Sequence, residues 1–198
     1  MKIGIYGASG DVEIQDSSID FIAVDRGYEY LLQKQIKPIE VIGDFDSIDD
    51  TMLILGDITT LPSVKDDTDT AIAIARAVDL GYDEIDLYGV TGGRLDHFIA
   101  VLRLLVQYPT IKICIYDNQN KIYSLHKGNH RIKKLNYQYI SFFSITNTYI
   151  SIEDVKYPLN DYYLQYADAL CVSNEIIGKD CQLKITDSVF VVQSNDKF

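Results

Sequence analysis

A chain of 198 residues with 47% hydrophobic and 24% charged residues can form one large or two small globular domains with a proper core. Its net charge of -11 argues against a nucleic-acid backbone or an anionic membrane as the main partner, because both would repel it. An acidic protein can still bind a polyphosphate when a divalent metal ion screens the repulsion.

Strands and helices are predicted to alternate over roughly the first 120 residues, which indicates a mostly parallel sheet with helices on its faces. Strands are predicted at 2–7, 21–27, 39–47, 58–64, 84–90 and 111–117. Helices are predicted at 28–36, 66–82 and 92–109. Pro38 and Pro109 end the first and third helices, Asp67 or Thr68 caps the second, and Gly81 closes it.

The pattern changes near residues 127–129. The remaining chain contains short runs rich in β-branched and aromatic residues, separated by turn residues, at 130–135, 139–145, 149–154, 169–177 and 181–194. No long helix is predicted there, so a small antiparallel β-domain fits best. We therefore expect an α/β domain at 1–127 and a β-domain at 128–198.

The cysteines and the apolar runs limit the class of protein further. Cys114, Cys171 and Cys181 are an odd number with no paired spacing, so neither a disulfide framework nor a zinc site is predicted. Buried, reduced thiols are expected instead. The N-terminal apolar run is too short for a signal peptide, and no apolar run reaches membrane-spanning length. We expect a cytoplasmic protein.

Four polar clusters fall where an open α/β sheet binds ligands, beyond the carboxyl ends of its strands. They are Asp25, the pair Asp44 and Asp46, the segment 65–69 (KDDTD) and the segment 91–97 (TGGRLDH). Each alone has an ordinary explanation as solvated turn acids, a helix cap or a tight turn with an exposed arginine. Their convergence on one edge of the sheet is a stronger signal than any one of them.

These clusters suit a metal–polyphosphate complex. Asp44 and Asp46 stand two residues apart, so they point the same way from an extended segment. Mg²⁺ prefers oxygen ligands, usually a few carboxylates together with substrate phosphates. The N–H groups of Gly92 and Gly93 can approach an anion at a helix start, and the guanidinium of Arg94 fits phosphate oxygens. The chain lacks the GxxxxGK[ST] motif, which excludes a P-loop enzyme.

Two further features stay open at this point. The glycine-rich segment GASG at 7–10 either lines a phosphate site or only turns the chain. His97 belongs to the TGGRLDH segment, but a single histidine is more often a hydrogen-bonded structural residue than a catalyst.

Taken together, the motifs resemble those of the thiamine pyrophosphokinases. The matching pieces, in the family's order and over most of the chain, are VDRGYEYLL, KPIEVIGDFDSI, KDDTDTAIAIA, GVTGGRLDH, KYPLNDYYL and VSNEI. GDFDS, DDTD and GGRLDH are specific as a set. The chain departs from the family pattern at Arg26, where the family usually has the first glycine of Asp-Gly-Gly. It also has no tryptophan, which some members place against the thiamine rings.

The resemblance implies a Rossmann-like N-terminal domain, a C-terminal β-sandwich and a homodimer whose active sites are shared between subunits. The implied reaction moves a diphosphate from ATP to the hydroxyl of thiamine, with Mg²⁺ as cofactor, and gives thiamine diphosphate and AMP. Neither nucleic acid nor a membrane is an expected partner.

The resemblance also carries roles over to individual residues. Catalytic roles fall to Asp46, Asp69 and Asp96. Metal binding falls to Asp44, Asp46 and Asp69. Contacts to ATP are expected from Asp25, Thr68, Gly92, Gly93 and Arg94. Contacts to thiamine are expected from Ser173, Asn174 and Tyr157.

Three other functions stay open from the sequence. A diphosphokinase of the same architecture could act on another alcohol, such as a hydroxymethylpterin, although the SNE and KYPL segments favour thiamine. A nucleotide- or thiamine-binding sensor without catalysis would not need so many buried like charges. A structural α/β protein would leave the same acids as solvated turn residues. Incubation with ATP, Mg²⁺ and thiamine distinguishes these functions.

Overall fold

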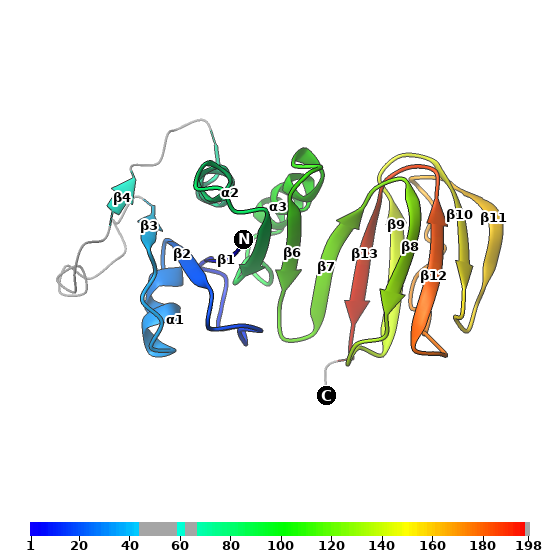
Figure 1. The fold of residues 1–198 in the computed structure, drawn as a ribbon, viewed down its shortest axis with the longest axis horizontal. Coiled ribbons are helices and arrows are strands. Elements are labelled where there is room, and N and C mark those ends of the chain that lie inside the picture. Colours follow the sequence, from blue (N-terminus) through cyan, green and yellow to red (C-terminus); the bar gives the residue numbers. More distant parts are fainter. Residues whose placement is uncertain (44–58, 62–66, 197–198) are drawn as a thin grey trace. The chain divides into compact units, whose positions relative to one another are not determined.

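The computed structural model describes residues 1–43, 59–61 and 67–196, with only the backbone at 59–61 (Figure 1). The chain divides into two compact units, 1–118 and 119–198. The sequence-based boundary at 127–128 assigned residues 119–127 to the first domain. In the structure β7 (Asn120–Leu125) belongs to the second unit, because it pairs along its whole length with β13 (Val189–Ser194).

The first unit is a parallel sheet with helices on both faces. Its strands are β1 (Lys2–Tyr6), β2 (Asp20–Val24), β3 (Glu40–Ile42), β4 (Thr59–Leu61), β5 (Glu84–Tyr88) and β6 (Lys112–Tyr116). They lie in the order β4-β3-β2-β1-β5-β6, and every neighbouring pair is parallel. The helices are α1 (Gly27–Gln33), α2 (Asp69–Asp79) and α3 (Leu95–Gln107). The predicted alternation of strands and helices in this half is confirmed.

One face of this sheet packs on α1. Tyr6 and Phe21 on the sheet share a buried cluster with Tyr28 and Leu31 of the helix. The helix starts close to the sheet because its first residue is glycine: a Cβ at Gly27 would collide with the carbonyl oxygen of Tyr6. This close approach fixes the turn that follows β2.

The opposite face is covered by α2 and α3, which Figure 1 shows on the other side of the sheet from α1. The side chains that α2 buries are small or aliphatic and recur at helical spacing: Ala71, Ala73, Ile74 and Ala77. Arg76 of α2 donates from Nε and Nη2 to the carboxylate of Glu40, at 2.8 and 2.6 Å. Glu40 is buried in β3, so this charged pair joins α2 to the strand that leads to Gly43.

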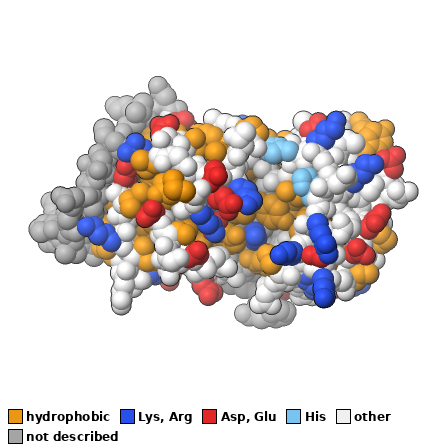
Figure 2. All heavy atoms as spheres, in the orientation of Figure 1, with side chains coloured by type: hydrophobic (Ala, Val, Ile, Leu, Met, Phe, Trp, Pro, Cys, Tyr) orange, Lys and Arg blue, Asp and Glu red, His pale blue; other side chains and the backbone are white. Residues whose placement is uncertain are grey.

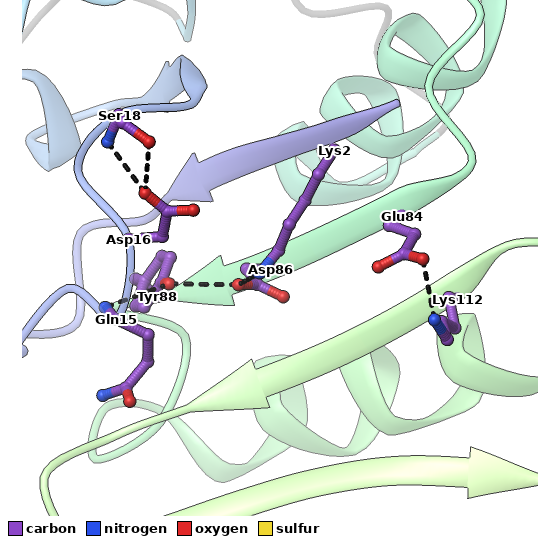
Figure 3. Close-up of polar contacts among 8 residues, drawn as sticks. All are labelled: Lys2, Gln15, Asp16, Ser18, Glu84, Asp86, Tyr88 and Lys112. Carbon is purple, nitrogen blue, oxygen red and sulfur yellow. Dashed lines mark hydrogen bonds and ion pairs between the residues drawn. The ribbon is translucent and has the colours of Figure 1, made fainter.

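A second polar network fastens the segment after β1 to the sheet (Figure 3). Asp86 of β5 is buried and lies 2.6 Å from the Nζ of Lys2. The hydroxyl of Tyr88 donates to Asp86 at 3.2 Å and accepts from the backbone N–H of Gln15 at 3.3 Å. Burial, with the Asp86 charge second, raises the pKa of Tyr88, so its hydroxyl stays protonated. This network runs from Lys2, at the start of β1, through Asp86 to Tyr88, at the end of β5, and holds the loop that contains Gln15 in place.

The second unit consists of antiparallel strands. Besides β7 and β13, they are β8 (Gly128–Lys133), β9 (Tyr139–Ser144), β10 (Thr148–Glu153), β11 (Leu159–Leu164) and β12 (Asp180–Ile185). Strands β7, β13 and β9 pair in that order, and β11-β10-β12-β8 form a four-stranded sheet. One buried apolar cluster takes residues from both groups, including Phe142 of β9, Ile150 of β10 and Val191 of β13. The chain thus has a mixed α/β fold with a mostly parallel sheet and a separate antiparallel sheet.

The structure corrects several local expectations. The run 169–177 was predicted as a strand but forms only isolated bridges, Ile140 with Asn174 and Val155 with Ile176. Strands β7 and β11 were not predicted. Helix α1 ends at Gln33, before the expected end at 36, because Gln35 adopts a left-handed φ of 60° ahead of Pro38.

The predicted burial of the three cysteines is only partly confirmed. Cys181 is buried, whereas Cys114 and Cys171 are half-buried, and all three thiols are free.

Within the described ranges, none of the helices combines the length and the apolar character needed to cross a membrane.

Candidate functional site

The carboxyl ends of the parallel strands lie at one edge of the first unit, and two loops meet there. The segment 7–10 follows β1, and the segment 89–94 follows β5. The N–H of Gly7 donates to the carbonyl of Tyr88, the last residue of β5, at 2.8 Å, and the N–H of Ser9 donates to the carbonyl of Gly89 at 2.7 Å. A Cβ on Gly93 would lie 2.9 Å from the Oγ of Ser9, so the two loops are in close contact. The sequence alone left the role of the 7–10 segment open. Its glycines, directly after the first strand, were the available sign that another loop packs closely against it.

At the start of α2 the sequence left two capping residues open, and the structure chooses between them. The Oγ1 of Thr68 accepts a hydrogen bond from the N–H of Ala71 at 3.2 Å, which makes Thr68 the N-cap. Asp67 accepts from the N–H of Thr68 at 3.1 Å instead. The N-terminus of α2 is therefore well formed without any contribution from the next residue, Asp69.

Asp69 is the feature of this edge that most needs a ligand. Its Oδ1 atom is buried and has no hydrogen-bond partner among the described residues. A buried carboxylate oxygen without a partner is costly, and such atoms usually mark a site for an ion, a water molecule or a catalytic group. An oxygen ligand of this kind fits Mg²⁺. The other two predicted ligands, Asp44 and Asp46, lie outside the described residues, and no group of three acidic, histidine or cysteine ligands occurs within them.

Asp25 stands at the carboxyl end of β2 in a strained backbone conformation. Its φ is 51°, in the left-handed region that non-glycine residues seldom adopt. Its N–H donates to the carbonyl of Ile42 at 2.9 Å, and a Cβ on Gly43 would collide with the Asp25 carboxylate. Asp25 and Gly43 therefore pack directly against each other where β2 and β3 end. Strain of this kind persists only when the surroundings enforce it, and it clusters at functional sites.

Arg94 and Asp96 face each other at the start of α3. The guanidinium of Arg94 donates from Nη2 and Nε to the two oxygens of Asp96, at 2.6 and 3.1 Å. Both side chains are exposed, and the bond from Arg94 is the main reason that the pKa of Asp96 falls to about 2. Asp96 also accepts the N–H of His97 at 3.0 Å, and His97 itself is exposed. An acid with this pKa stays ionised at neutral pH and is a weak general base.

One acidic residue at this edge was missed by sequence reasoning. Asp117 follows β6, and its Oδ2 accepts a hydrogen bond from the Oγ1 of Thr91 at 2.8 Å. The bond ties the end of β6 to the start of the TGGRLDH segment. The position of Asp117 directly after an apolar run was the available signal, the same one that singled out Asp25.

In the second unit, the structure brings Tyr157 into contact with Asn174, the neighbour of Ser173, although 17 positions separate the two in the sequence. Asn174 is only 3% exposed, and its side chain is hydrogen-bonded to the backbone of Tyr157 on both sides. Tyr157 itself is 61% exposed. Ser173 is exposed, has a left-handed φ of 55°, and donates its N–H to the Oγ of Ser141 at 2.9 Å. Tyr157 and Ser173 are thus open to a ligand, whereas Asn174 is buried and bonded to the backbone of Tyr157.

Two family models match the chain, one in each unit. The model described as "Thiamin pyrophosphokinase, catalytic domain" matches residues 13–115. The model described as "Thiamin pyrophosphokinase, vitamin B1 binding domain" matches residues 129–190.

Relatives with known sequence or structure cover nearly the same length. The thiamine pyrophosphokinase of Bacillus subtilis is 36% identical over 167 residues, which are 79% of this chain and 78% of that protein. A crystal structure of the enzyme from the same organism aligns at 30% identity over 100% of both chains with a TM-score of 0.91. The thiamin pyrophosphokinase from Geobacillus thermodenitrificans aligns at 29% identity over 100% of this chain and 99% of that one, with a TM-score of 0.91. The enzyme from Candida albicans, at 14% identity, 98% and 89% coverage and a TM-score of 0.85, shares the fold.

Proposed function

The chain belongs to the thiamin pyrophosphokinase family, and from that premise we propose how its residues carry out the reaction. It is a kinase-type transferase that forms thiamine diphosphate. We propose that ATP is the donor, that the hydroxyl of thiamine attacks the β-phosphorus, and that AMP leaves. The match to a curated thiamine pyrophosphokinase favours thiamine over the pterin alcohol that the sequence left open.

One observation carries this proposal. The predicted phosphate and metal residues all fall in the part matched by the catalytic-domain model, and the predicted thiamine residues all fall in the part matched by the vitamin B1 binding model. The first group is Asp25, Asp44, Asp46, Thr68, Asp69, Gly92, Gly93, Arg94 and Asp96. The second group is Tyr157, Ser173 and Asn174. The same division supports a Rossmann-like description of the first unit and a β-sandwich description of the second.

Mg²⁺ is the proposed cofactor, held by Asp69 together with Asp44 and Asp46. When bound, it would neutralise phosphoryl oxygens and so allow an acidic protein to bind a polyphosphate. The buried Oδ1 of Asp69, which has no hydrogen-bond partner in the part of the chain that the structure describes, supports this assignment. The Thr68 cap would help to position Asp69 for the metal ion, because it orders the first turn of α2, where Asp69 stands.

The remaining steps use the chain's own groups. The N–H groups of Gly92 and Gly93 would donate to phosphate oxygens, and Arg94 would add a guanidinium that can exchange its partner Asp96 for a phosphate. Charge spreads over phosphoryl oxygens during transfer, so fixed donors at this loop supply electrostatic stabilisation. Asp96 would act by its charge, because its low pKa makes it a poor proton acceptor.

The assay follows the nucleotide product. With thiamine, ATP and Mg²⁺, we expect AMP to form in step with thiamine diphosphate, as measured by chromatography. Excess chelator should stop both. ADP as the sole nucleotide product would contradict diphosphate transfer, and full turnover in chelator would contradict the metal.

We also propose a cytoplasmic homodimer with active sites shared between subunits. An Asp46→Asn chain and a chain changed at both Ser173 and Asn174 should each be inactive. After mixed refolding, half of the dimers are mixed and half of their sites are intact, so about a quarter of the activity should return. No recovery despite proven subunit exchange would reject the shared site.

A further inference from the structure

The segment 171–174 lies beside strand β9 without being a regular strand. The N–H of Phe142 donates to the carbonyl of Cys171 at 2.9 Å, and Asn174 exchanges two backbone hydrogen bonds with Ile140, at 2.8 and 2.9 Å. Cys171 and Ser173 both adopt left-handed φ angles, 69° and 55°. Two non-glycine residues with left-handed φ angles, only two positions apart, are costly, so the surrounding contacts must hold them there.

The side chain of Asn174 takes the place of a peptide group. Its Oδ1 accepts the N–H of Tyr157 at 3.0 Å and the N–H of Glu175 at 2.9 Å, while its Nδ2 donates to the carbonyl of Tyr157 at 2.8 Å. The amide thus pairs with both backbone groups of Tyr157, as a neighbouring strand would. At 3% exposure it cannot lie against a ligand across any large surface.

Other contacts hold the same stretch. The N–H of Lys156 donates to the carbonyl of Glu175 at 2.9 Å, and the Lys156 Nζ lies 2.7 Å from the Glu175 carboxylate. The same Nζ lies 5.6 Å from the centre of the Tyr157 ring. Tyr157 is therefore an exposed aromatic side chain on a backbone that Asn174 and Glu175 hold by hydrogen bonds, which is what a preorganised ligand contact requires.

We propose that Asn174 is a positioning residue for thiamine, which acts by fixing the backbone of Tyr157 and touches no substrate itself. The inference rests on the proposed function, in which Tyr157 and Ser173 contact thiamine. The ring of Tyr157 would pack on a flat ring of thiamine, and the adjacent Ser173 would offer its hydroxyl. Loss of the Asn174 amide would then weaken thiamine binding through movement of Tyr157 and would leave ATP binding unchanged.

The absence of tryptophan from the whole chain allows a direct test. Tyr157→Trp in the full chain creates a single fluorescent reporter at the proposed contact, and thiamine should quench it. Adding Asn174→Ala should lower the anisotropy of this reporter and raise the dissociation constant for thiamine about ten-fold, with the constant for ATP changed less than about two-fold. Asn174→Asp keeps the acceptor for the N–H groups of Tyr157 and Glu175 but sets a carboxylate oxygen against the Tyr157 carbonyl; it should change both readings in the same direction and serves if the alanine variant does not fold.

The chain offers a matched control in Asn147. Its Oδ1 accepts the N–H of another exposed tyrosine, Tyr166, at 3.0 Å, and its Nδ2 donates to the hydroxyl of Tyr163 at 3.1 Å. Asn147→Ala in the Tyr157→Trp chain should leave both the anisotropy and the thiamine constant unchanged. If Asn147→Ala lowered the anisotropy and the affinity for thiamine as much as Asn174→Ala does, the effect of Asn174→Ala would be general destabilisation, and the inference would be overturned.

A double-mutant cycle separates positioning from contact. If Asn174 acts through Tyr157, Asn174→Ala should raise the thiamine KM in the wild-type chain but add less than about two-fold in a Tyr157→Ala chain. A full ten-fold increase in both backgrounds would mean that Asn174 binds thiamine itself. A Tyr157→Trp enzyme that still turns thiamine over, but whose fluorescence thiamine does not quench, would also reject the inference. If no variant and no wild-type chain turns thiamine over, the proposed function fails. A lower fluorescence anisotropy after Asn174→Ala would then show only that Asn174 holds the backbone at position 157.

Discussion

Two polar side chains of the proposed active site are buried in opposite ways. Asp69, in the first unit, keeps a buried carboxylate oxygen with no hydrogen-bond partner among the described residues. Asn174, in the second unit, uses its amide for three hydrogen bonds within the protein. Burial without a partner costs free energy unless a ligand is bound, whereas satisfied burial stabilises the fold. The difference indicates that Asp69 is built for a ligand and Asn174 for architecture.

The two units also differ in net charge, and the more acidic unit is the one that contains Asp69. Residues 1–118 contain 21 acids and 9 bases, and residues 119–198 contain 8 acids and 9 bases. On the face shown in Figure 2, acidic and basic side chains are interspersed over the second unit. The net negative charge of the protein therefore resides in the unit proposed to bind ATP, because the other unit is close to neutral. A bound cation would relieve this repulsion locally, which leads to the first prediction.

Asp69→Asn should cause the largest loss of activity. The substitution keeps the shape but removes the charge, so we expect kcat to fall on the order of 10²-fold or more, as after loss of one preorganised electrostatic group. Thermal unfolding without metal should stay the same or shift upward, because the buried oxygen no longer carries an unpaired charge. Mg²⁺ should raise the unfolding temperature of the wild type and not of the variant.

Asp79 provides the matched control for this prediction. It is an exposed acid in the last turn of the same helix, α2, so Asp79→Asn makes the same chemical change away from the strand ends. Activity and the response to Mg²⁺ should be close to those of the wild type. Near-normal turnover of Asp69→Asn would mean that its orphan oxygen has no catalytic use.

Asn174→Ala should cause a large loss of stability, whereas Asp69→Asn should lower kcat without lowering stability. Three hydrogen bonds disappear, and backbone groups of Tyr157 and Glu175 lose their partners, so unfolding should become easier by about 2–3 kcal/mol. Denaturant unfolding measures the change. The exposed Asn147→Ala should cost less than about 1 kcal/mol. If Asn174→Ala and Asn147→Ala were equally stable, the hydrogen bonds of Asn174 would not stabilise the fold, and the contrast drawn between Asn174 and Asp69 would be wrong.

Thr68→Ala should have a smaller effect. The Oγ1 of Thr68 caps α2, and loss of such a cap costs about 1 kcal/mol. Thr68→Ser keeps the oxygen and should restore most of the stability. Thr70→Ala, two residues later and not a cap, should change stability by less than about 0.5 kcal/mol. If Thr68 also contacts ATP, the KM for ATP should rise in the alanine variant alone.

Much of the first unit could be predicted from the sequence, because its strands are short apolar runs followed directly by turn residues. The run KIGIY before Gly7 and the run EIDLY before Gly89 each became a strand as expected. The second unit was harder, because long-range pairing overrides local pattern there. The run 169–177 looks like a strand, but two left-handed residues keep its Cys171–Asn174 part as an irregular partner of β9. Strand β7, with only Ile122 buried, is a strand because β13 lies beside it.

The places of some candidate residues in the fold could be predicted, but their hydrogen bonding could not. Asp25 directly follows β2, and Asp69 and Asp96 stand in the first turns of α2 and α3, whereas Asp44 and Asp46 lie outside the described residues. The sequence could not indicate that Asp69 has a buried oxygen without a partner among residues 1–43 and 67–196, since an acid in the first turn of a helix is also a common stabilising residue. Nor could it show that Asn174 is buried beneath Tyr157, because that contact joins residues far apart in the chain.

The smallest expected effect concerns the exposed pair Arg94 and Asp96, the third polar arrangement of the site. The pKa of Asp96 falls from its ordinary value of 3.8 to about 2, mainly because of the hydrogen bond from Arg94. Since the folded-state pKa lies below that of the unfolded chain, the pair adds stability above about pH 4 and loses it as the pH falls toward 2. Arg94→Gln should return the pKa of Asp96 toward 3.8, as followed by a carboxyl NMR titration.

Salt and ATP should test the same pair without a mutation. Because both side chains are exposed, about 1 M salt should raise the pKa of Asp96 in the wild type and have little effect in Arg94→Gln. If Arg94 exchanges Asp96 for a phosphate when ATP binds, ATP should raise the pKa of Asp96 in the same direction. The opposite finding, an Asp96 that titrates near its ordinary value of 3.8 in the wild type without ligand, would mean that the pair does not form in solution. The guanidinium of Arg94 would then be available to a phosphate without first leaving Asp96.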